Sequence, residues 1–201
     1  MNDFEPPWIF VHIQRTGGNS VRTALGGSIG DPRKHFTAQE LREVYGGAAW
    51  KSSFKFSFVR NPWDRLLSWW SLIDNSRNFN DRPPNGFFGY VLERTRSFED
   101  FLLRCDDEIV DSDGRKSIFR NQIDYLADED GELIVDFVGR FEQLQEGFAE
   151  IASRLGRPLA KLPQVNFSQH GKYTEYYTPK MAEIVAKRYA RDISKFGYRF
   201  E

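Results

Sequence analysis

Small, polar and basic residues gather in the stretch HIQRTGGNS, residues 12–20, directly after a short apolar run. The glycine pair Gly17 and Gly18 lets the backbone turn tightly and direct its N–H groups at an anion. A helix that follows would add the positive end of its dipole. Arg15 contributes a full charge, and the short polar donors are Thr16, Asn19 and Ser20. This pattern favours a phosphate-binding loop, and an ordinary strand-to-helix turn is the alternative.

A second candidate cluster lies in FVRNPWDRLLS, residues 58–68. Arg60 follows a strand pattern, at the end of the strand where open α/β sheets bind their ligands. Ser68 falls two helical turns later, on a helix that can begin at Pro62. A guanidinium and a hydroxyl that converge on one phosphate would suit each other well. The alternative is that Arg60 forms a salt bridge with Asp64 and that Ser68 is an ordinary helix residue.

The two clusters differ from those of nucleotide-hydrolysing P-loop proteins. The Walker A pattern, G-x-x-x-x-G-K-[ST], does not occur in the chain. No acidic residue stands out at a strand end where it would hold a metal ion. These two absences argue against a P-loop-type kinase, which stays only as an alternative.

Both clusters resemble the nucleotide-binding motifs of sulfotransferases that use 3′-phosphoadenosine-5′-phosphosulfate (PAPS), in particular carbohydrate-type and bacterial members. FVHIQRTGGNS is similar to their 5′-phosphosulfate loop, which is close to F-x-H-x-P-K-T-G-G-T-S, and VRNPWDRLLS to their 3′-phosphate motif, R-(N/D)-P-x-x-R-x-x-S. The loop departs from that pattern at three places, because Gln14 replaces proline, Arg15 lysine and Asn19 threonine. Arg15 keeps the charge and adds a planar fork, but it cannot donate a proton. We expect electrostatic stabilisation of the leaving oxygen in place of proton transfer.

The resemblance implies an enzyme that moves the sulfuryl group of PAPS to a hydroxyl acceptor without a metal. Weaker matches at residues 138–144 and 176–198 extend the resemblance from residue 9 to residue 200. The segment SQHGKY, residues 168–173, occupies the place of a basic loop that in relatives closes over the nucleotide. The nucleotide-binding residues implied are Gln14, Arg15, Thr16, Gly17, Gly18, Asn19, Ser20, Arg60, Ser68, His170, Gly171 and Lys172.

Sulfuryl transfer to an alcohol needs a base that takes the hydroxyl proton. His12 lies inside an expected strand, which favours a core position. His35, in KHFTAQEL, lies between the two motifs, and this segment resembles the H-F-T-A segment of bacterial members. We expect His35 to be the base and Arg15 to be the second catalytic residue. Glu43 and Asp64 are the other candidates for the base.

The elements that must position these residues follow from hydrophobic periodicity and helix caps. Thr37 and Glu40 form the capping box of a helix. Residues 75–89 read as a long loop, a candidate lid or acceptor-binding segment. Strands are expected at residues 8–13, 54–59 and 133–138, and helices at 20–25, from 62 onward, at 98–104, 120–126, 142–155 and 179–196. Alternating strands and helices indicate an α/β fold. The resemblance specifies a P-loop-like central parallel sheet flanked by helices, the sulfotransferase fold, in a single domain over residues 1–201.

Composition restricts the partners of the protein. The 28 basic and 29 acidic residues give a net charge of −1, which argues against general nucleic-acid binding. The single cysteine, Cys105, excludes an intramolecular disulfide and a cysteine-based metal cluster. No apolar run approaches the about 20 residues that span a bilayer, and the N-terminus lacks the pattern of a secretory signal. We expect a cytoplasmic protein with no membrane span, although an excised luminal domain would look the same.

The acceptor and the oligomeric state stay open at this level. The segment 75–89, together with Arg115, Lys116, Arg120 and Gln122, could hold an anionic sugar, and equally a lipid, a peptide tyrosine or a small metabolite. A carbohydrate or small metabolite is the acceptor that we expect. A catalytically inactive protein that binds 3′-phosphoadenosine-5′-phosphate (PAP) is the alternative from another class. Trp63 is the one aromatic residue that we expect beside the ligand.

Overall fold

The computed structural model describes residues 7–78, 86–105, 118–157, 161–163 and 171–201. The chain divides by its contacts into two compact units. The first unit consists of Met1–Arg60 and Gln122–Asn166, and the second of Asn61–Asn121 and Phe167–Glu201. The chain therefore leaves the first unit after Arg60 and returns to it at Gln122. The expectation of a single domain stays a prediction.

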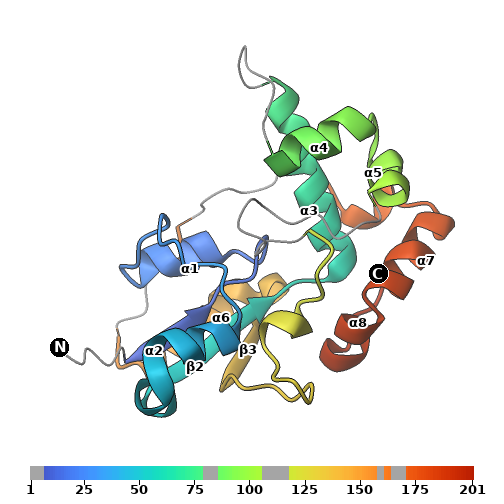
Figure 1. Ribbon diagram of the computed structural model, residues 1–201. Helices are drawn as coiled ribbons and strands as arrows, with labels where there is room; N and C mark the ends of the chain where they lie inside the picture. The colour runs from blue at the N-terminus through green and yellow to red at the C-terminus, as the bar shows by residue number, and fades with distance from the viewer. Residues whose placement is uncertain (1–6, 79–85, 106–117, 158–160, 164–170) are drawn as a thin grey trace. The chain divides into compact units, whose positions relative to one another are not determined.

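The first unit contains a parallel three-stranded sheet in the order β1-β2-β3 (Figure 1). Its strands are β1 (Trp8–Val11), β2 (Phe54–Val59) and β3 (Phe137–Arg140). The pairs Phe10↔Phe56 and Phe56↔Phe137 set the register across the sheet. Because all three strands run the same way, the segments that follow Val11, Val59 and Arg140 leave from one edge. The mixed α/β class with a central parallel sheet is thereby confirmed.

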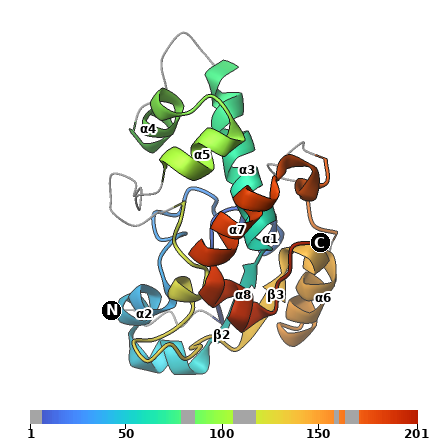
Figure 2. The same cartoon turned by 90° about the vertical axis from the view of Figure 1, so that its right-hand side faces the viewer.

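Helices cover both faces of this sheet (Figure 2). The elements are α1 (Gly18–Ala24), α2 (Ala38–Ser52) and α6 (Leu144–Arg154), with 3₁₀ turns η2 (Ile123–Tyr125) and η3 (Phe141–Gln143). On one face, α1 and α6 bury a single apolar cluster against the strands, formed by Phe10, Val21, Leu25, Phe56, Phe58, Phe148 and Ile151. On the other face, Lys55 Nζ of β2 lies 5.8 Å from the ring centre of Trp50 in α2.

Local signals set several of the boundaries. The capping box of α2 is confirmed, because Thr37 Oγ1 accepts from the Glu40 N–H at 3.1 Å and Glu40 Oε2 accepts from the Thr37 N–H at 2.8 Å. The third strand was predicted at residues 133–138 and lies at Phe137–Arg140, so its predicted start was four residues too early. Leu133 instead pairs with Ala127 in an isolated antiparallel bridge, and β3 begins at Phe137.

The second unit is helical in its described part, and its longest described helix is α3 (Pro62–Asn75) (Figure 1). Its other elements are α4 (Gly86–Arg94), α5 (Phe98–Arg104), α7 (Pro179–Arg188), α8 (Ala190–Phe196), η1 (Ser76–Asn78) and η4 (Tyr173–Tyr176). Stacked and edge-on aromatic rings join these elements. The Phe98 and Tyr177 rings meet edge to face at 5.0 Å, and Phe101 lies 5.5 Å from Phe119.

The structure differs from two predictions for this unit. The segment 75–89 is not a loop throughout, because α3 ends at Asn75 and α4 begins at Gly86, while residues 79–85 lie outside the described residues. The helix expected over residues 179–196 is divided at Tyr189, whose buried hydroxyl donates to the Ile118 carbonyl at 3.0 Å. In the part of the chain that the structure covers, no helix has the length and apolar character that a membrane crossing requires.

Candidate functional site

The loop between β1 and α1 has a constrained backbone. Arg15 has a φ of 66° and is the one non-glycine with positive φ among the described residues, and Gly17 follows with 78°. An L-residue in this left-handed region costs roughly 1–2 kcal/mol, and strain of this kind concentrates at functional sites. Thr16 is buried, and its hydroxyl donates to the Ile13 carbonyl at 2.9 Å. The Gly17 carbonyl accepts from the Ser20 N–H at 3.0 Å and begins α1.

Both glycines of the loop are required by packing. A Cβ on Gly18 would lie 2.0 Å from the His12 ring, and one on Gly17 would lie 2.6 Å from Leu144 at the start of α6. The His12 ring is in turn stacked on Phe10 at 5.3 Å and 12°. The loop backbone is therefore held between the end of β1 and the beginning of α6.

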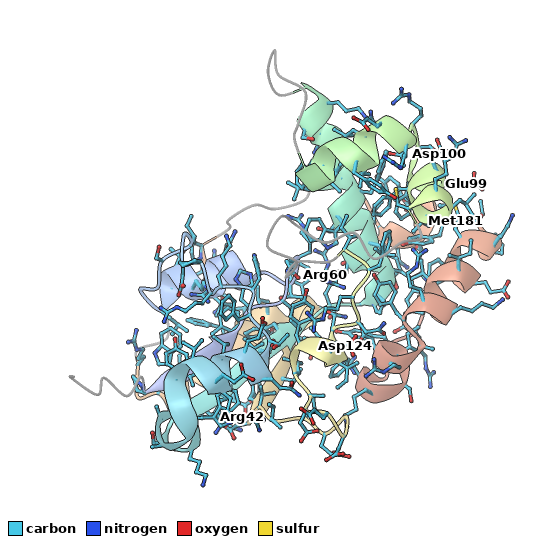
Figure 3. All side chains as sticks on the ribbon, in the orientation of Figure 1. Arg42, Arg60, Glu99, Asp100, Asp124 and Met181 are labelled. Atoms are coloured by element: carbon cyan, nitrogen blue, oxygen red, sulfur yellow. The ribbon has the colours of Figure 1, made fainter. Side chains whose placement is uncertain are left out.

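Arg60, at the carboxyl end of β2 (Figure 3), meets this loop. Its side chain is buried, with 4% of the residue exposed. Nη1 donates to the Arg15 carbonyl at 3.1 Å, and the guanidinium lies over the Phe141 ring at 4.0 Å from its centre. The Arg60 backbone is bound by the side chain of Gln122. The residues of the two sequence motifs, 45 positions apart, thus come together within the first unit.

His35 also contacts His12, the residue that follows β1. Its Nδ1 lies 3.0 Å from the His12 carbonyl oxygen, and the two imidazole rings are 4.7 Å apart. A carbonyl only accepts, so Nδ1 carries the proton. The neutral His35 ring therefore has its basic lone pair on Nε2, the arrangement that a proton acceptor needs.

His12 is held in its neutral form. Burial, and then the positive charges of His35 in its protonated form, Arg22 and Lys34, keep the pKa of His12 well below its usual 6.5. Its Nδ1 and the side-chain oxygen of Asn19 are both buried without a hydrogen-bond partner among the described residues. Buried polar atoms are normally satisfied. Rotation of the Asn19 side-chain amide would place its NH₂ group where its oxygen now lies, and there it would donate to an anion. The loop therefore fits a phosphate-bearing ligand.

The other candidate residues lie in different surroundings. Gln14 is buried in the loop, and Ser20 is buried in the first turn of α1. Ser68 is fully buried in α3, in the second unit, where Gly171 and Lys172 are exposed and the Gly171 N–H donates to the Tyr176 hydroxyl at 3.3 Å. His170 lies outside the described residues, as do Arg115 and Lys116. The structure therefore groups the loop, Arg60 and His35 in one unit, and the roles of Ser68 and residues 170–172 stay sequence predictions.

Glu43 and Trp63 also have defined positions. Glu43 is an exposed residue of α2. Trp63 is in the core of the second unit, where its indole N–H donates to the Ala182 carbonyl at 2.9 Å and its ring lies 5.6 Å from that of Phe200. Its surroundings in this unit are those of a packed core residue.

Sequence reasoning missed the parts that Gln122 and Phe141 play around Arg60. It treated Gln122 as one of several residues that could hold an acceptor, whereas both ends of its side-chain amide bind the Arg60 backbone. Phe141 appeared only as part of a softer family match. A buried glutamine beside a 3₁₀ turn and an aromatic residue after a strand carry no signal of their own, because their partner is 62 or more positions away.

Comparison with models of known families gives a match to the Sulfotransferase family over residues 31–199. The chain belongs to this family, and the resemblance found in its sequence is confirmed. The match includes His35, Arg60 and Ser68, and it begins after the loop of residues 12–20. Comparisons with curated proteins and with solved structures gave no match. Membership supports sulfuryl transfer as the general activity and disfavours the kinase alternative.

Proposed function

We propose that this sulfotransferase uses PAPS as its donor and transfers the sulfuryl group to a hydroxyl of a carbohydrate or a small metabolite. The observation that carries the proposal is the bond from Arg60 Nη1 to the Arg15 carbonyl. It brings the two motifs expected for the 5′-phosphosulfate and the 3′-phosphate together in a family member. A donor with phosphates at both ends of one nucleoside matches two adjacent basic anchors.

In this proposal the residues divide between binding and chemistry. The donor would supply an activated sulfuryl group with a phosphate as leaving group. The loop backbone and Ser20 hold the 5′ end, and Arg60 holds the 3′-phosphate. Arg15 stabilises the negative charge that develops on the leaving oxygen. Because arginine stays charged at any physiological pH, it acts as a fixed positive charge and not as an acid.

His35 is the proposed base. Its Nδ1–H is bonded to the His12 carbonyl, so Nε2 takes the proton of the acceptor hydroxyl. The imidazolium that forms keeps the same bond, which orients it and favours its charge. His12 stays neutral as its neighbour becomes charged, because burial lowers its pKa. A second positive ring at this separation would oppose the proton transfer.

Ligand-dependent melting followed by a transfer assay tests the proposal. PAP at a hundred times its Kd should stabilise the protein by about 2.7 kcal/mol, which raises the Tm by about 5–10 °C for a chain of this size. ATP with magnesium should raise it far less. Labelled PAPS should then transfer its sulfuryl group to members of an acceptor panel, also in the presence of a chelator.

Two results would contradict the proposal. A larger Tm shift with ATP and magnesium than with PAP would favour a kinase. A clear PAP shift without transfer to any carbohydrate, lipid, phenol or small alcohol would favour the alternative of a PAP-binding protein that has no catalytic activity.

A further inference from the structure

One glutamine side chain satisfies both backbone groups of Arg60. Gln122 Oε1 accepts from the Arg60 N–H at 2.8 Å, and Gln122 Nε2 donates to the Arg60 carbonyl at 2.8 Å. Gln122 is fully buried, with 0% of the residue exposed. Its amide thus does for Arg60 what a neighbouring strand would do in a sheet ladder. Arg60 needs this partner because β2 ends one residue earlier, at Val59.

The guanidinium group of Arg60 is also held in place. The guanidinium lies 4.0 Å over the Phe141 ring, a cation–π contact, and Nη1 donates to the Arg15 carbonyl. Phe141 also lies next to the loop, because a Cβ on Gly17 would come within 3.2 Å of its ring. Backbone and side chain of Arg60 are therefore both fixed from within the first unit. Arg60 and Gln122 are also the residues at which the chain leaves this unit and returns to it.

We infer that Gln122 is a positioning residue for recognition of the donor's 3′-phosphate. The inference rests on the proposed function, in which Arg60 binds that phosphate. A guanidinium that is already held in place loses little conformational freedom when the anion arrives, and this preorganisation increases affinity. Gln122 touches neither nucleotide nor acceptor in this scheme and acts through the Arg60 backbone.

PAP and AMP distinguish a positioning role of Gln122 from a purely structural one. PAP and AMP differ by the 3′-phosphate alone, so the ratio of their Kd values measures recognition of that group. A glutamine that only stabilised the core would change the melting temperature and leave this ratio unchanged. A positioning residue must change the ratio.

The experiment measures Kd for PAP and for AMP by calorimetry in the wild type, Gln122→Met, Gln122→Glu and Arg60→Ala. Methionine has a similar length and makes neither bond, so we expect Gln122→Met to reduce the preference for PAP by about fivefold to tenfold. Affinity for AMP should stay within about twofold. Gln39→Met is the matched control, because Gln39 also donates to a distant backbone carbonyl, that of Ala127 at 3.4 Å. It should leave the ratio unchanged.

Gln122→Glu keeps the inference testable if the methionine variant does not fold. A protonated glutamic acid retains one donor and one acceptor, whereas the carboxylate only accepts. Relative to the wild type at each pH, this variant should therefore lose its preference for PAP as the pH rises from 5.5 to 8. A ratio that follows the wild type over this range would overturn the inference, as would an unchanged ratio in Gln122→Met.

Arg60→Ala distinguishes failure of the role inferred for Gln122 from failure of the proposed function. If Arg60→Ala removes the preference for PAP and the Gln122 variants keep it, the inference about Gln122 fails and the proposed function stands. If the wild type does not prefer PAP, or if Arg60→Ala retains the preference, the proposed function fails and the inference fails with it.

Discussion

At the scale of single residues, the site combines a strained arginine with a histidine of fixed tautomer. Arg15 has a backbone conformation that glycine would adopt without strain, and its carbonyl accepts the bond from Arg60. His35 is oriented by the hydrogen bond between its Nδ1 and the His12 backbone carbonyl. The conformation of Arg15 and the orientation of His35 therefore both depend on the backbone that follows β1. Substitution of either side chain leaves these backbone groups in place.

Arg15 should influence the rate more than nucleotide affinity. If its charge acts on the leaving oxygen, Arg15→Ala lowers kcat strongly while affinity for PAP, which has no sulfuryl group, falls less. Arg15→Lys restores the charge and should keep substantial activity. Single-turnover rates and Kd values for PAP measure the two effects. An inactive and well-folded Arg15→Lys would show that the planar fork is essential.

Backbone strain at Arg15 gives a separate prediction about stability. Glycine adopts a φ of 66° without the steric penalty of an L-residue. Arg15→Gly should therefore be more stable than Arg15→Ala by about 1 kcal/mol, although both lose activity. Urea unfolding compares the two variants. Equal stabilities would mean that the left-handed conformation is not retained in solution.

His35 should control the pH dependence of the rate. The base must be neutral to accept a proton, so kcat should rise with pH as His35 loses its proton. His35→Ala should reduce kcat by about 10²–10⁴-fold and remove this dependence, while PAP binding changes little. A near-normal kcat with a saturating acceptor would exclude His35 as the base and make Glu43 and Asp64 the next candidates.

At the scale of elements, the start of α3 is tied to the C-terminal segment of the second unit. Asn61 Oδ1 accepts from the Trp63 N–H at 3.1 Å and caps the helix. Its Nδ2 donates to the Arg199 carbonyl at 2.8 Å and to the Tyr173 hydroxyl at 3.1 Å. One side chain thus performs three tasks at the residue that follows Arg60.

Asn61→Ala should destabilise the protein by about 2–3 kcal/mol, because it removes a helix cap and two further hydrogen bonds. Asn61→Asp keeps the capping oxygen and lacks the donor, so its loss should be smaller. Ser97→Ala, which removes only the cap of α5, should cost about 1 kcal/mol. Urea unfolding gives all three values. An Asn61→Ala loss no larger than that of Ser97→Ala would show that the bonds to the C-terminal segment contribute nothing.

At the scale of the whole molecule, His12 links stability to pH. Its pKa is lowered in the folded protein, first by burial and then by the nearby positive charges. The unfolded chain therefore binds more protons than the folded one between the folded pKa and the usual 6.5. In this window stability rises with pH, and it is lost as the pH falls below about 6.5.

His12→Phe tests this linkage. Phenylalanine can retain the stack on Phe10 and has no titratable group. The free energy of unfolding of the wild type should fall between pH 6.5 and pH 5 by up to about 1.4 kcal/mol per pH unit more than that of the variant. Parallel pH profiles would show that His12 does not titrate on unfolding in this range.

The sequence by itself determined what depends on neighbouring residues. Thr37 and Glu40 indicate the start of α2, and Pro62 indicates the start of α3. The six residues of β2 were predicted at their observed positions. These signals need only local sterics, periodicity and short-range hydrogen bonds. The two motifs also identified the family, because their residue types and spacing are unusual together.

Only the tertiary structure decided which distant residues meet. The bonds of Gln122 to Arg60 and of His35 to the His12 carbonyl join positions 62 and 23 apart, and no periodic pattern encodes either. The same holds for the start of β3, because the pairing of Leu133 with Ala127 outweighs the strand propensity of its own segment. Long-range contacts form where packing and buried hydrogen bonds are satisfied together, and that is a property of the folded chain.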